Sequence, residues 1–76
     1  MKATRYFEEQ VLMKRTYLNL EMCVNVVSNP LKKEIQEDGR TRYWGFVPEL
    51  NKFIRVVVLE DGETIHNAFM DRNFKQ

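Results

Sequence analysis

Four side chains in this sequence are of the types that cleave RNA without a metal ion: Glu34, Tyr43, Arg55 and His66. Such cleavage needs a base that takes a proton from the 2′-hydroxyl, an acid that protonates the leaving 5′-oxygen, and a cation that stabilises the charge on phosphorus. Glu34 or His66 could be the base, and His66 or Tyr43 the acid. Arg55 is the candidate phosphate clamp, because a guanidinium can bind phosphate through two parallel hydrogen bonds.

Each of these side chains also has a purely structural interpretation. A lone histidine in a strand, such as His66, is more often a structural or surface residue. Arg55 could lay its stem over Val57 and Leu59 while its head group stays in water. Tyr43 could stack on an RNA base, or simply cover a bare sheet. The apolar Val57 and Leu59 also fit a surface that a partner protein covers.

Composition excludes several other kinds of site. The 76 residues are enough for one domain, which we place at 1–76. A single cysteine, Cys23, excludes an internal disulfide, and one cysteine with one histidine makes a Cys/His zinc site improbable. The three glycines form no phosphate-binding loop, so no cofactor is implied. No apolar run approaches the ~18 residues of a membrane span, and no signal-peptide pattern is present, so no membrane partner is expected.

The charge balance gives no general indication of nucleic-acid binding. Twelve basic residues stand against eleven acidic ones, for a net charge of +1, whereas nucleic-acid-binding domains are usually clearly basic. A local basic face stays possible if the charges segregate on folding. The basic residues most clustered in the sequence are Lys14-Arg15, Lys32-Lys33, Arg40 and Arg42.

The first third of the chain has helical periodicity. Thr4 is a suitable N-cap for a first helix that ends near Arg15, and Asn19 for a second over about Leu20–Ser28. Asn29-Pro30 ends the second helix, because the residue before proline is driven out of the helical region.

After Pro30 the apolar period changes to alternation, which predicts four strands: Leu31–Glu37, Arg40–Val47, Phe53–Leu59 and Glu63–Phe69. The Asp38-Gly39 and Asp61-Gly62 pairs predict two-residue hairpin turns with positive φ at both glycines. The expected fold is α+β, with two N-terminal helices packed on one face of a four-stranded antiparallel β-meander.

These turns also set an expected register. Lys33 lies opposite Trp44, and Phe46 lies opposite Ile54 if the central pair is aligned to keep one face apolar. Trp44 is then buried against the first helix. The face without helices carries Glu34, Tyr43, Arg55 and His66 in one patch, and the small residues Gly45 and Ala68 leave space around the guanidinium.

The order of elements resembles a small prokaryotic family of unknown function that is often set beside the BrnT- and RelE-like ribonuclease toxins. The residues that carry the resemblance are Arg5–Arg15, Asn29-Pro30, Asp38-Gly39-Arg40, Tyr43-Trp44-Gly45, Phe53–Val58 and Ile65-His66. The resemblance implies a cytoplasmic protein of a toxin–antitoxin setting, with an acidic or hydrophobic antitoxin segment as its partner. Of the candidate site residues, Arg55 and His66 map onto it.

Two functions therefore stay open at the level of the sequence. The first is a metal-independent endoribonuclease of the RelE/BrnT-like toxin fold. The second is a non-catalytic domain of the same fold that binds a protein through its open face or an edge strand. A positive open face favours RNA, whereas a mixed or apolar one favours a protein partner.

Overall fold

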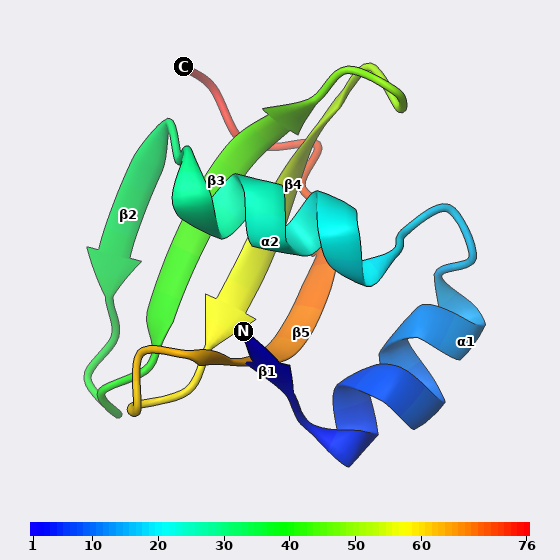
Figure 1. The fold of residues 1–76 in the computed structure, drawn as a ribbon. Coiled ribbons are helices and arrows are strands. Elements are labelled where there is room, and N and C mark those ends of the chain that lie inside the picture. Colours follow the sequence, from blue (N-terminus) through cyan, green and yellow to red (C-terminus); the bar gives the residue numbers. More distant parts are fainter.

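A computed structural model describes residues 1–76 and shows a five-stranded sheet with α2 lying across one face (Figure 1). The strand order is β1-β5-β4-β3-β2. The strands are β1 Lys2–Ala3, β2 Lys32–Ile35, β3 Thr41–Val47, β4 Lys52–Val58 and β5 Thr64–Met70. The helical segments are η1 Phe7–Val11, α1 Leu12–Lys14 and α2 Leu20–Ser28. No helix is both long and apolar enough to cross a membrane.

The expected fold, two helices on a four-stranded antiparallel meander, is wrong. The sheet is mixed, because β1 pairs in parallel with β5. The Lys2 N–H donates to the Glu63 carbonyl at 3.0 Å, and the Thr4 N–H donates to the Ile65 carbonyl at 2.9 Å. A strand of two residues is too short to show an alternation of apolar and polar residues in the sequence. Only its pairing with β5 identifies β1 as a strand. This strand fixes the N-terminus at the β5 edge of the sheet.

The two helical segments also do not pack as a pair. The first runs from η1 into α1 and contacts β5, whereas α2 contacts β3 and β4 (Figure 1). Thr4 caps the first segment as expected, since its Oγ1 accepts the Phe7 N–H at 3.0 Å. Asn19 caps α2 as expected, since its Oδ1 accepts the Met22 N–H at 2.8 Å.

The core lies between the helices and the face of the sheet they cover. Phe7 and Val11 of η1 and Cys23 and Val26 of α2 are buried there. The sheet contributes Tyr43, Val47, Ile54, Val56, Val58, Ile65 and Ala68. We call this the helix face, and the opposite side of the sheet the open face.

The predicted register of β3 is shifted by one residue at both of its neighbours. Lys32, not Lys33, lies opposite Trp44, and Phe53, not Ile54, lies opposite Phe46. The first hairpin has a three-residue loop: the Gln36 N–H donates to the Arg40 carbonyl, and the Gly39 N–H donates to the Gln36 carbonyl. Gly39 has the predicted positive φ, +86°, but as the last residue of a longer loop rather than in a two-residue turn.

A shift of one residue turns β3 over. Tyr43 lies on the helix face, and so does Gly45, where an added Cβ would lie 3.1 Å from both methyl groups of Val26. Trp44 is buried as predicted, with 6% of its surface exposed, but it lies on the open face, outside the cluster of buried residues on the helix face. Its expected packing against the first helix is therefore wrong.

The β4–β5 pair keeps the predicted alignment only near its turn. Val58 lies opposite Ile65 as expected, and Gly62 has the predicted positive φ, +74°. A register shift then places Val57 opposite Asn67, so His66 is the extra residue of a β-bulge. Bulges re-aim side chains, and this one lets Ile65 and Ala68 both reach the core.

Candidate functional site

A hollow of about 260 Å³ lies on the open face and is lined mainly by basic and polar side chains. We call it the basic hollow. Strands β3, β4 and β5 and the loop before β3 supply its lining: Gln36, Arg40, Arg42, Arg55, Val57, His66, Asn67 and Phe69. Three of these residues are arginines and none is acidic. Convergent guanidinium groups without a matching carboxylate in the lining favour an anionic ligand.

The arginines differ in how well their charges are already paired. Arg42 is paired with Glu34 on the neighbouring strand, with its Nη1 3.1 Å from the Glu34 Oε1. Arg40 only approaches Glu60 at 3.7 Å and Asp38 at 3.9 Å. These separations are too long for hydrogen bonds, so the Arg40 guanidinium keeps its donors for another acceptor.

Arg55 is held between aromatic rings. Its guanidinium carbon lies 4.3 Å from the Phe69 ring centroid and 5.8 Å from that of Trp44. Its Nε is buried and has no hydrogen-bond partner, and the nearest Asp71 oxygen is 3.9 Å away. A buried guanidinium N–H without an acceptor is costly, so this position favours an anionic group that can come closer.

His66 is fixed by the first helical segment. Its Nδ1 lies 3.1 Å from the Thr4 Oγ1, and its ring centroid lies 5.0 Å from that of Tyr6. The Nδ1 contact leaves Nε2 as the nitrogen available to a ligand. Partial burial, and then the positive charge of Arg40, lower the pKa of His66 below its usual value of 6.5. The imidazole is therefore neutral near pH 7, which is the form that accepts a proton.

The structure brings together two of the four predicted site residues, Arg55 and His66, in the basic hollow. Glu34 lies on the open face beside it, ion-paired with Arg42, and lines a separate hollow. Tyr43 is on the helix face with only 8% of its surface exposed, so it does not join the other three. The expected small neighbours of Arg55 are replaced by Trp44 and Phe69.

The sequence-based site did not include Arg40, Arg42 and Asn67, which the structure adds to the lining. Arg40 and Arg42 were visible as a local basic cluster next to the first turn. A three-residue loop at that turn would have placed Arg42 beside Arg55 and His66. Asn67 faces the open side because of the bulge at His66, for which the sequence carries no marker.

Aromatic side chains continue the open face beyond Arg55. The C-terminal segment, residues 71–76 after β5, lies over Trp44 there. It passes behind the sheet in Figure 1, on the side away from α2. The Trp44 Nε1–H donates to the Asp71 Oδ2 at 2.9 Å, and the Phe74 ring stacks on Trp44. This hydrogen bond is the main reason that the pKa of Asp71 is lowered. Phe53 contacts both Phe74 and Phe46, and Phe46 is 45% exposed.

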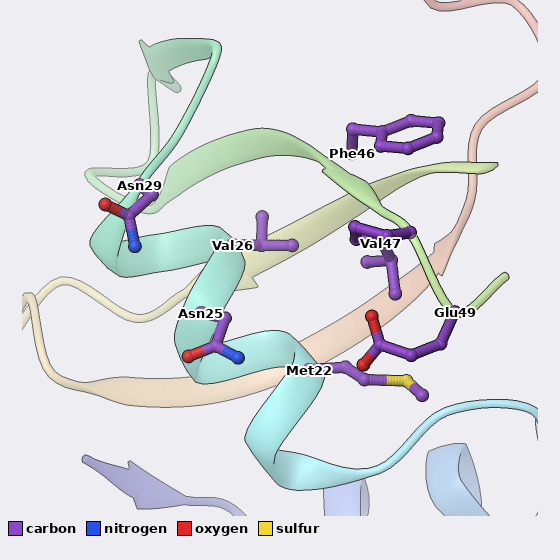
Figure 2. Close-up of a pocket in the computed structure, with 8 residues that line it drawn as sticks. Met22, Asn25, Val26, Asn29, Phe46, Val47 and Glu49 are labelled. Atoms are coloured by element: carbon purple, nitrogen blue, oxygen red, sulfur yellow. The ribbon is translucent and has the colours of Figure 1, made fainter. Parts of the chain in front are cut away.

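A larger hollow of about 400 Å³ lies between α2 and the β3–β4 loop (Figure 2). Met22 and Val26 of α2 face Val47 of β3, and the Glu49 carboxylate turns toward the helix. The polar residues at its rim, including Asn25, are exposed and bring no cation or histidine to the space. It therefore lacks the converging chemical groups of the basic hollow.

No group of three or more histidine, cysteine, aspartate or glutamate side chains is arranged to hold a metal ion. A scan against protein-family models matches no family, and searches of curated proteins and of solved structures find no match. Function is therefore inferred from the site alone.

Proposed function

We propose that the protein binds single-stranded RNA on its open face and cleaves it, without a metal ion, at the basic hollow. The observation that carries this proposal is the convergence of Arg40, Arg42 and Arg55 with His66 on a hollow that no acidic residue lines. Arginine binds phosphate oxygens through directed hydrogen bonds. Aromatic side chains beside such a patch suit single-stranded RNA, whose unstacked bases are commonly bound by stacking.

The proposed cleavage uses His66 as the base. In the tautomer that this requires, the Nδ1–H donates to the Thr4 Oγ1 and Nε2 carries no hydrogen. Nε2 then takes the proton of a 2′-hydroxyl, and the 2′-oxygen forms a bond to phosphorus. The bond from phosphorus to the 5′-oxygen breaks, and that oxygen takes a proton from water. The arginines stabilise the additional negative charge of the transition state. The products carry a 2′,3′-cyclic phosphate and a 5′-hydroxyl, which distinguishes this reaction from metal-dependent hydrolysis that leaves a 5′-phosphate.

The test is cleavage of a mixed RNA pool in the presence of a chelator. We expect His66→Ala and Arg55→Ala each to lower the rate about 100-fold, as removal of a proton acceptor or a transition-state donor typically does. Lys33→Ala removes a positive charge from the helix face and serves as the matched control. No cleavage by the wild type, or equal cleavage by all variants, would contradict the proposal.

A second candidate function is binding of a protein partner at the edge strand β2. All four residues of this strand are exposed, and Ile35 is 69% exposed. An unpaired edge with an apolar side chain can accept a strand from another chain. Co-expression with the product of an adjacent gene tests this: a complex that survives gel filtration with wild type but not with Ile35→Asp would support it. Retention of the complex by Ile35→Asp would exclude β2 as the contact.

A further inference from the structure

The C-terminal segment makes two contacts on the open face that resemble those of a bound nucleotide. The Phe74 ring stacks on Trp44 with a centroid distance of 5.7 Å and an interplanar angle of 14°. The same ring meets Phe53 edge-on at 5.2 Å. The Asp71 carboxylate lies beside Arg55, with 3.9 Å between its Oδ2 and the Arg55 Nε. An aromatic ring thus lies on the tryptophan, and an anion beside the arginine.

From this arrangement we propose that Trp44, Phe53 and Arg55 form a nucleotide subsite, which the C-terminal segment fills in the free protein. Phe74 takes the place of a base and Asp71 that of a phosphate. The inference rests on the proposed RNA binding, and it adds a second position to the basic hollow. Arg55 belongs to both, so it joins the two positions along one strand of RNA.

The Asp71 carboxylate does not reach hydrogen-bond distance of the Arg55 Nε, and this favours its replacement by a phosphate. The 3.9 Å separation leaves the buried Arg55 Nε–H without an acceptor. A phosphate oxygen that reaches hydrogen-bond distance of this group would remove the cost of an unpaired donor. A nucleobase offers a larger stacking surface to Trp44 than the Phe74 ring does, and each stacked base contributes substantially to binding.

The segment is attached in a way that allows it to leave. The Asp71 N–H donates to the Phe53 carbonyl at 3.0 Å, so the backbone at Asp71 stays joined to β4. Beyond it, only Phe74 is partly buried, whereas Arg72, Asn73, Lys75 and Gln76 are exposed. Release of the Phe74 ring and loss of the hydrogen bond from the Trp44 Nε1–H to the Asp71 Oδ2 would open the subsite without unfolding the sheet.

Trp44 is the only tryptophan of the chain, so its fluorescence reports on the subsite directly. The experiment measures binding of 2′-O-methyl hexauridylate, which lacks the attacking hydroxyl, to wild type, Phe74→Ala, Asp71→Asn and the control Asn73→Ala. We expect Phe74→Ala to bind about 5- to 10-fold more tightly than wild type, because stacking of about one base no longer competes with the segment. Asp71→Asn should bind more tightly too, and Asn73→Ala should match wild type.

Two other results would overturn the subsite, and each has a different meaning. If Phe74→Ala binds the oligonucleotide as wild type does, or more weakly, the segment does not compete with RNA, whereas RNA binding itself stands. If neither wild type nor Phe74→Ala binds at any concentration, the proposed function fails together with the subsite. Far-ultraviolet circular dichroism of each of the three variants checks that the sheet is intact.

Discussion

The environment of His66 makes the stability of the folded protein depend on pH. Burial and Arg40 lower its pKa in the folded protein, whereas in the unfolded chain it stays near 6.5. As the pH falls through that value, the unfolded chain therefore takes up the proton first. Stability that is complete above the unfolded pKa is lost as the pH falls from there to the lower, folded pKa, and then levels off.

We expect this loss to disappear in His66→Gln. Thermal unfolding of both proteins across the acidic side of neutrality measures it, and the difference between the two curves removes the contributions of carboxylates. Identical curves would show that the folded and unfolded pKa values of His66 are the same.

Cys23 is a buried thiol with no role in the proposed site. Burial raises its pKa to about 12, so almost no thiolate, the reactive form, exists at neutral pH. We expect a thiol reagent to modify the native protein far more slowly than the protein in denaturant. Equally fast reaction in both conditions would show that α2 opens readily and that the core beneath it is accessible.

At the scale of the elements, Gly45 sets the distance between β3 and α2. A Cβ at this position would lie 3.1 Å from both methyl groups of Val26 and 3.3 Å from its Cα. We expect Gly45→Ala to lower the free energy of unfolding by about 1–3 kcal/mol through overpacking. Urea unfolding measures the change.

The same substitution in a Val26→Ala background identifies the cause. Removal of the two methyl groups relieves the closest contacts, so Gly45→Ala should cost less there, with a coupling of about 0.5–3 kcal/mol between the positions. An equal cost in both backgrounds would mean that α2 does not press on Gly45.

The local signals in the sequence predict where elements begin and turn. Thr4 and Asn19 cap their helices, and Gly39 and Gly62 have the expected positive φ. These properties depend on neighbours within a few residues, so the sequence contains them. The π-helical turn over Phe7–Val11 contacts β5, and the two-residue strand β1 pairs with it. No local pattern in the sequence marks either element.

The face of β3 is the element-scale property that the sequence could not determine. In β3, Trp44 and Phe46 share one face of the strand, and Tyr43 lies on the other. All three side chains are large and aromatic, so the pattern does not show which face is the apolar one. The turn before it is compatible with two loop lengths that differ by one residue. For this reason Tyr43 was expected on the open face. The face of Arg55 was easier to predict, because Ile54, Val56 and Val58 alternate with it. His66 follows Ile65, whose pairing with Val58 is the one that the second turn predicts.

At the scale of the whole molecule, what matters is how a nearly neutral charge is distributed. The twelve basic and eleven acidic residues give a net charge of +1. Yet three arginines line one hollow without an acidic residue, and the hollow next to it is lined by Glu34, Glu37 and Asp38 together with Arg42, which lines both. RNA binding, if it follows the basic hollow, must therefore depend on a few phosphate contacts rather than on the total charge.

Salt dependence measures that number. Each phosphate neutralised on a single strand contributes about −0.7 to the slope of log affinity against log salt, so contacts from Arg40, Arg42 and Arg55 predict a slope of about −2 for 2′-O-methyl hexauridylate.

Arg40→Gln should make the slope less steep by about 0.7, because this guanidinium has no carboxylate within hydrogen-bond distance. Lys33→Gln makes the same change in net charge on the helix face, where Lys33 lies over the Tyr43 ring, and should leave the slope unaltered. If both substitutions reduce the slope equally, binding follows the net charge of the molecule, and the basic hollow is not the place where RNA is held.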